Sequence, residues 1–130
     1  MNDSASHARQ WLAKAKSDLV AAERLIAADG PYDAVCFHAQ QTAEKALKAL
    51  LALARAPILH THNLEDLQAA CLQLTSVSVP MVLSTWQLAD LTPFAVESRY
   101  DVEFWPDEQT ARLAVALARE VLETIAGIIA

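Results

Sequence analysis

The sequence predicts an all-α protein, an up-and-down bundle of four to five helices in a single domain over residues 1–130. Hydrophobic residues make up 54% of the chain and many are Ala, while only two Gly and five Pro interrupt it. This composition favours helices. Apolar residues also recur at steps of three and four, the period of a helix with one buried face. A chain of 130 residues is long enough for one hydrophobic core.

Two long helices are predicted first. One runs from Ser6 to Ala28, and Gly30 and Pro31 then end it and begin the next. The second runs from Pro31 to about Arg55. Its expected apolar seam consists of Tyr32, Val35, Ala39, Ala43, Leu47, Leu50 and Leu51. Because the seam is rich in Ala, we expect a neighbouring helix to approach closely.

Shorter elements follow. Residues 56–62 contain Pro57 and no apolar period, which predicts a loop, and Asn63 is expected to cap a third helix. The apolar residues of that helix are Leu64, Leu67, Ala70, Cys71 and Leu74. A fourth helix is expected from Pro80, with a kink or an early end at Pro93. It would carry Val82, Leu83, Trp86, Leu88, Ala89, Leu91 and Phe94.

The last part of the chain is predicted to be irregular over residues 97–106 and then helical to the C-terminus. Asp107 is expected to cap this last helix. Its expected core face consists of Leu113, Ala116, Leu117, Val121, Leu122 and Ile125.

Charge and composition exclude several classes of function. The net charge of −6 gives no overall field that would attract nucleic acid or an anionic membrane. No uncharged apolar run approaches the roughly 20 residues of a membrane span, and the polar N-terminus does not resemble a signal peptide. Cys36 and Cys71 lie in helical patterns that need no disulfide. We therefore expect a soluble, cytoplasmic protein.

The most informative segment runs from Phe37 to Leu51. His38, Gln41, Lys45 and Lys48 fall within about 80° of one another on one helix face. Lysines supply positive charge for a phosphate, and Gln and His supply hydrogen bonds. The stripe predicts either a phosphate or nucleotide site or an ordinary solvated face.

The sequence resembles the HEPN domain family. The resemblance rests on the order of several short motifs from Trp11 to the last helix. They are Trp11, Asp18-Leu19, Tyr32 with Ala34, Gln41-x-x-Glu44-Lys45-x-x-Lys48, Thr61-His62 and Arg99-Tyr100. The resemblance implies a helical bundle, usually dimeric, that acts with a small nucleotidyltransferase as a toxin–antitoxin pair. The Ala-rich seams also favour a homodimer.

Many members of that family cleave RNA without a metal through an arginine and a histidine that are separated by four to six residues. Arg55 with His60, or Arg55 with His62, fits this spacing. In the ribonuclease members the motif lies late in the chain, whereas no histidine follows Arg99 here. We therefore favour a noncatalytic nucleotide-binding or interaction module, with a metal-independent ribonuclease toxin as the alternative.

Arg99 and Tyr100 have two interpretations. They join Lys45 and Lys48 in one anion-binding corner, or Arg99 pairs with a carboxylate at the end of the bundle. Arg112 and Arg119 share a face with neighbouring Glu residues and are expected to be solvated. His60 and His62 lack a third ligand at a metal-binding spacing. We expect no metal site and no cofactor.

Overall fold

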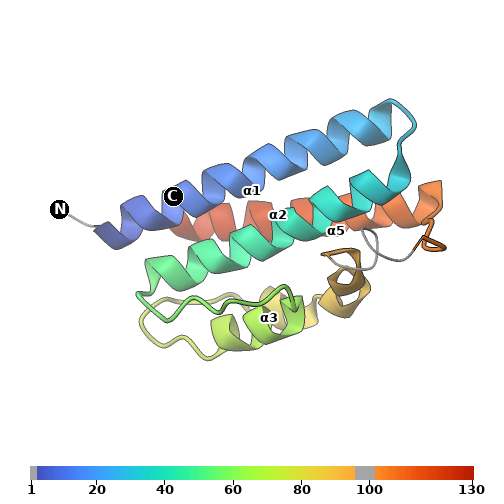
Figure 1. Cartoon of the computed structure of the whole chain (residues 1–130). Helices are drawn as coiled ribbons and strands as arrows, with labels where there is room; N and C mark the ends of the chain where they lie inside the picture. The colour runs from blue at the N-terminus through green and yellow to red at the C-terminus, as the bar shows by residue number, and fades with distance from the viewer. Residues whose placement is uncertain (1–2, 96–101) are drawn as a thin grey trace.

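The chain folds as an all-α bundle in the computed structural model, which describes residues 3–95 and 102–130 (Figure 1). Its α-helices are α1 (Asp3–Ala27), α2 (Tyr32–Leu53), α3 (Leu64–Leu72) and α5 (Glu108–Ile129). Three 3₁₀ helices, η1 (Met81–Thr85), η2 (Leu88–Asp90) and η3 (Thr92–Ala95), lie between α3 and α5. The described residues contain no strand, so the predicted fold class is confirmed. None of the described helices is both long and apolar enough to cross a membrane.

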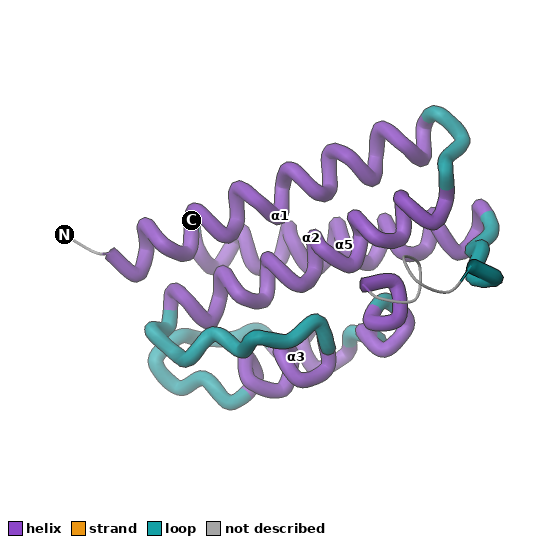
Figure 2. The backbone as a smooth tube through the Cα atoms, viewed as in Figure 1, coloured by secondary structure: helices purple, strands orange, loops and turns teal. Residues whose placement is uncertain are grey.

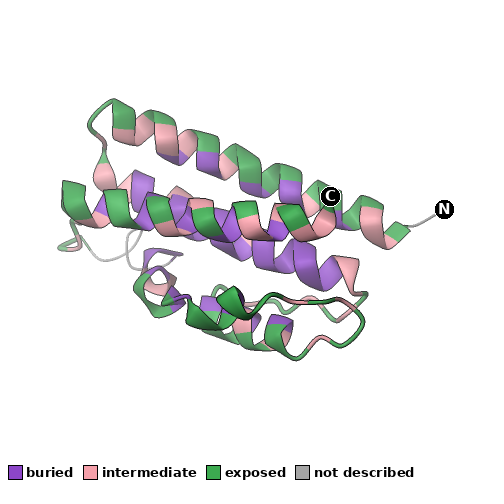
Figure 3. Cartoon of the chain, turned by 180° about the vertical axis from the view of Figure 1, so that it is seen from behind, coloured by how far each residue is buried: buried purple, intermediate pink, exposed green. Residues whose placement is uncertain are grey.

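α2 lies at the centre of the bundle. It runs antiparallel to α1, while α5 returns behind the pair in the same direction as α2 (Figures 1 and 2). α3 and the segment that follows it cover another side of α2. Buried residues therefore extend along α2 and over the inward faces of α1 and α5 (Figure 3). This central position brings even polar side chains of α2 into the interior.

Small residues line the contact between α1 and α2. Ala8, Ala15 and Ala22 repeat at seven-residue steps on α1 and are fully buried. On α2 the predicted seam from Val35 to Leu51 is buried as expected, and Tyr32 is half-buried, its hydroxyl 3.2 Å from Glu108 Oε1. Alanine side chains let two helix backbones come close without cavities.

The predicted caps are confirmed. Asn63 Oδ1 accepts the backbone N–H of Asp66 at 2.9 Å, and Asp107 Oδ1 accepts that of Thr110 at 2.8 Å. α1 ends where the N–H of Gly30 donates to Leu25 O at 2.8 Å. Gly30 has a φ of 109°, a conformation that glycine adopts without steric cost. Short polar residues and one glycine thus set these boundaries as the sequence indicated.

The prediction of a fourth α-helix from Pro80 is wrong, because three short 3₁₀ helices occupy this segment. The hydroxyls of Ser84 and Thr85 each donate to a carbonyl three residues earlier at 2.7 Å, and such bonds compete with helical ones. Gln68 of α3 donates to Leu83 O at 2.5 Å and to Trp86 O at 3.2 Å. These carbonyls are satisfied by α3, so an α-helix is not required for them.

Part of the predicted core face of α5 is also wrong. Leu113 is 64% exposed and Ala116 is exposed. The buried residues are Ala111, Ala114, Val115, Ala118, Val121, Leu122 and Ile125. The predicted and the observed core faces both follow helical spacing and share Val121, Leu122 and Ile125. The apolar period alone therefore could not show which of the two faces is buried. α5 packs its alanines inward, where they let it approach α1 and α2. Leu74, expected on the third helix, lies beyond the end of α3.

Candidate functional site

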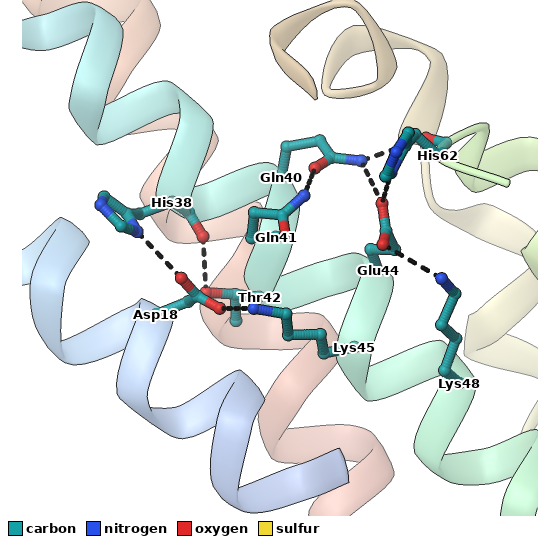
Figure 4. A network of polar contacts seen from close by, with 9 residues as sticks. All are labelled: Asp18, His38, Gln40, Gln41, Thr42, Glu44, Lys45, Lys48 and His62. Carbon is teal, nitrogen blue, oxygen red and sulfur yellow. Dashed lines mark hydrogen bonds and ion pairs between the residues drawn. The ribbon is translucent and has the colours of Figure 1, made fainter. Parts of the chain in front are cut away.

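A network of polar side chains joins α1, α2 and the loop before α3 (Figure 4). It contains all four residues of the predicted stripe. Two carboxylates that the sequence analysis named only as parts of family motifs, Asp18 and Glu44, hold its cations and histidines. The network therefore consists of two groups, each built around one carboxylate.

The first group surrounds Asp18 of α1. His38 Nδ1 lies 2.9 Å from Asp18 Oδ1, and Lys45 Nζ donates to Asp18 Oδ2 at 2.6 Å. Because a carboxylate only accepts hydrogen bonds, Nδ1 must carry the proton in this contact. The side chains of His38 and Lys45 are 32% and 24% exposed, whereas Asp18 is 12% exposed. The imidazole and the ammonium group thus keep partial access to solvent, whereas the carboxylate between them is mostly buried.

The second group surrounds Glu44, whose side chain is only 5% exposed. Lys48 Nζ donates to Oε2 at 3.2 Å, while Gln40 Nε2 donates to Oε1 at 3.1 Å. His62 Nδ1 lies 2.8 Å from the same Oε1. Gln40 also donates to the backbone oxygen of His62 at 3.1 Å. A buried carboxylate needs such partners, and here they fasten the loop before α3 to α2.

Lys48 is more buried than we expected from its place in the predicted stripe. Its side chain is 10% exposed, and Nζ lies 5.5 Å from the centroid of the Trp11 ring of α1. A cation over an indole face is attracted by the electrons of the ring. Trp11 Nε1 is buried without a hydrogen-bond partner among the described residues. Lys48 is therefore committed to Glu44 and Trp11, and the interpretation of the stripe as a solvated face is wrong for this residue.

Gln41 belongs to the group around Glu44 through its contact with Gln40. Its Nε2 donates to Gln40 Oε1 at 2.7 Å, which orients both amides. Two lysines and two carboxylates cancel in charge, so the network is neutral when both histidines are neutral. The stripe is accordingly no free basic face. The members that keep partial access to solvent on α2 are His38, Gln41 and Lys45.

The residues proposed for ribonuclease chemistry lie in different surroundings. Arg55 follows α2 with a φ of 58° and lines a hollow of about 590 Å³ together with His7 of α1. Neither His60 nor His62 lines that hollow. His60 is exposed, and His62, although 64% exposed, is held by Glu44. Arg55 thus shares this hollow with His7, a histidine that the spacing along the chain did not indicate.

The other predicted site residues are placed as follows. Arg99 and Tyr100 lie outside the described residues. Arg112 pairs with Glu108 at 2.8 Å on the surface, as expected. Arg119 instead reaches across to Glu23 of α1 at 2.7 Å, so the prediction of a merely solvated side chain is wrong there.

The two carboxylates missing from the predicted stripe differ in how well their ion pairs could have been predicted. Glu44 and Lys48 are four residues apart on one helix, a spacing that favours an ion pair, so that contact was readable. Asp18 lies on another helix and is 27 residues from Lys45. Nothing local indicates that pairing, because it depends on how α1 packs against α2.

The described residues were also compared with the requirements of a metal site. Among the described residues, no three His, Cys, Asp or Glu side chains are grouped to hold a metal ion. Cys36 and Cys71 are free and buried. What the network offers instead is hydrogen bonding and positive charge from His38, Gln41 and Lys45 next to solvent.

Comparison with known proteins gives one family and one solved structure. The model of the HEPN domain matches residues 8–128. The crystal structure of TT1696 from Thermus thermophilus is 31% identical, with a TM-score of 0.76 and 98% of both chains covered. No curated protein matches the chain.

Proposed function

Because the chain belongs to the HEPN family, we propose that it is a noncatalytic nucleotide-binding and interaction module that acts with a small nucleotidyltransferase in a toxin–antitoxin pair. The observation that carries the nucleotide-binding part is the group of His38, Gln41 and Lys45 on α2. These three side chains lie on one helix face, keep access to solvent and supply donors of the kind that a phosphate requires.

Asp18 regulates the charge of this site. It lies 2.6 Å from Lys45 and 2.9 Å from His38, so it neutralises the lysine and repels an incoming anion. A phosphate that takes hydrogen bonds from Lys45 and His38 must compete with this carboxylate. The proposal therefore gives Asp18 and Lys45 opposite effects on affinity, which a purely structural network would not.

Two features support a noncatalytic role. Metal-independent cleavage requires a proton-transferring group held within hydrogen-bond reach of the reacting oxygen. Arg55 lines a hollow that neither loop histidine lines, and no histidine follows Arg99, where the ribonuclease members carry their motif. The partner is proposed from the family alone, and we expect a nucleotidyltransferase to be encoded beside this chain.

Calorimetric titration with ATP tests the binding site. We expect Lys45→Gln to weaken binding about tenfold, a change of roughly 1.4 kcal/mol, because a charge-assisted contact is lost. Asp18→Asn keeps the shape but removes the negative charge, so it should strengthen binding. Lys16→Gln, an exposed lysine of α1, is the control for net charge. No ATP binding, or equal affinity in all four proteins, would contradict the proposal.

The same preparation incubated with total RNA, without added metal, tests the alternative. We expect no appreciable cleavage by the wild type. Cleavage that disappears in His60→Ala or His62→Ala would establish the ribonuclease and overturn the noncatalytic role. Cleavage that persists in both variants would place activity outside these histidines or in a contaminant.

A further inference from the structure

Unpaired positive charge is concentrated on one part of the molecule. Among the described residues, Lys45, Lys48, Arg112 and Arg119 lie in ion pairs with carboxylates. The other described cations take part in none of these pairs, and all lie on α1 or directly after α2. They are Arg9, Lys14, Lys16, Arg24 and Arg55. In a chain with a net charge of −6, the described cations outside these ion pairs thus lie along α1 and directly after α2.

Two of these cations stand at the ends of a groove. A hollow of about 590 Å³ is lined by Asp3, Ser4, His7, Ala52, Arg55, Ala56 and Ile58. A second hollow of about 330 Å³ is lined by His7, Gln10, Trp11 and Lys14. Because His7 lines both, they adjoin, and we call them together the α1 groove.

The α1 groove follows one face of the helix. His7, Gln10, Trp11 and Lys14 are spaced by three, four and seven residues, which places them along a single face. Lys14 lies about 10 Å beyond His7 along the helix axis. Figure 1 shows the start of α1 beside the end of α2, where Arg55 follows. The groove therefore has a guanidinium near one end and an ammonium at the other.

Besides these two cations and the polar residues Asp3, Ser4 and Gln10, the lining is apolar or aromatic. Ala52, Ala56 and Ile58 contribute aliphatic surface, and the half-buried Trp11 contributes its indole. His7 lies 6.4 Å from the Trp11 ring, measured between ring centroids. Positive ends with an apolar middle are complementary to a segment with negative ends and an apolar middle.

We propose that the α1 groove binds a short acidic segment of a partner protein, in which two carboxylates flank an apolar side chain. One carboxylate contacts Arg55, whose planar guanidinium suits bidentate pairing. The other contacts Lys14, and the apolar side chain lies against Ile58 and its neighbours. This goes beyond nucleotide binding, since the groove lies outside the His38, Gln41 and Lys45 site.

The charges favour a peptide over a nucleic acid strand. Nucleic acid affinity rises with the number of phosphates that cations neutralise, and the α1 groove offers two cations beside His7. Asp3 lines it as well and would repel a strand that carries a phosphate at every nucleotide. A peptide can place its charges only where Arg55 and Lys14 are.

Selection of a random 12-residue phage-display library on the full-length protein tests the proposal. We expect recovered peptides with two Asp or Glu residues flanking an apolar residue. Fluorescein-labelled copies should lose about tenfold or more in affinity for the double variant Lys14→Gln/Arg55→Gln. The control Lys16→Gln/Arg24→Gln removes the same charge from exposed positions outside the groove and should bind like the wild type.

Three results would overturn the proposal. They are a selection without enriched acidic sequences, an equal loss of affinity in the control variant, and tighter groove-dependent binding of a labelled 12-nucleotide oligouridine. Thermal melts of both double variants should match the wild type, because neither pair of residues makes an ion pair in the structure. ATP titration of the same variants shows whether the nucleotide site is affected, so that a failure of the groove proposal can be distinguished from a failure of the proposed function.

Discussion

Glu44 illustrates how one residue takes its role from its surroundings. Its carboxylate is nearly inaccessible and receives hydrogen bonds or an ion pair from Gln40, Lys48 and His62. An isolated buried charge would be strongly unfavourable, whereas a charge with several donors is tolerated. Glu44 and Lys48 therefore belong to the framework of the site, while Lys45 keeps the access that ligand binding needs.

The two cysteines give a prediction at this scale. Burial raises the pKa of both Cys36 and Cys71 to about 12, so at pH 8 only about one thiol in 10⁴ is the reactive thiolate. We expect both to react far more slowly with DTNB in the folded protein than in urea, as measured by absorbance at pH 8. Rapid reaction of either thiol in the folded protein would show that its site opens easily.

The contact between α1 and α2 is best understood at the level of elements. Its alanines leave no room for larger side chains, since Ala15 is fully buried. We expect Ala15→Leu to lower the free energy of unfolding by about 1–3 kcal/mol through overpacking, measured by urea denaturation. Ala13→Leu, at an exposed position of the same helix, should change it little. Equal stability of the two variants would mean that the seam is loosely packed.

The segment from Met81 to Ala95 shows the limit of periodicity for single elements. Its apolar residues Leu83, Leu88, Leu91 and Phe94 are buried as predicted, although the backbone is not α-helical. The pattern therefore identified most of the side chains that face the core, whereas Val82 and Ala89 of the predicted set are exposed. It did not identify the backbone, because Gln68 and two local hydroxyls satisfy carbonyls that an α-helix would otherwise use.

For the whole molecule we predict a homodimer, as the family suggests; the Ala-rich seams that also favoured it are buried within one chain, between α1 and α2. Leu113 is exposed beside a hollow of about 490 Å³ lined by Leu91, Phe94 and Leu117, the kind of apolar surface that a second copy would cover. Light scattering at micromolar concentration should give about twice 14.2 kDa. Leu113→Asp should reduce the mass toward that of one chain.

Val20→Asp is the control for this measurement, because Val20 is an exposed apolar residue of α1 outside the hollow. It should leave the dimer intact. A wild-type mass near 14.2 kDa would contradict the dimer itself. A dimer that survives Leu113→Asp would place the interface on another surface.

The sequence by itself determined the helical class, the long helices, both side-chain caps and the family. These features depend on local patterns, since a period of three to four residues, a capping Asn or Asp and a short motif are each readable within a few turns of chain.

Only the tertiary structure decided what the polar residues do. The stripe on α2 looked like one set of four donors, but Asp18, 27 residues from Lys45, neutralises the lysine. Packing against α1 and the loop before α3 encloses Lys48 and leaves Lys45 partly exposed. Likewise, Arg55 lines a hollow with His7, 48 positions earlier in the numbering. Charge pairing and burial depend on distances across the fold, and these are fixed by helix packing rather than by spacing along the chain.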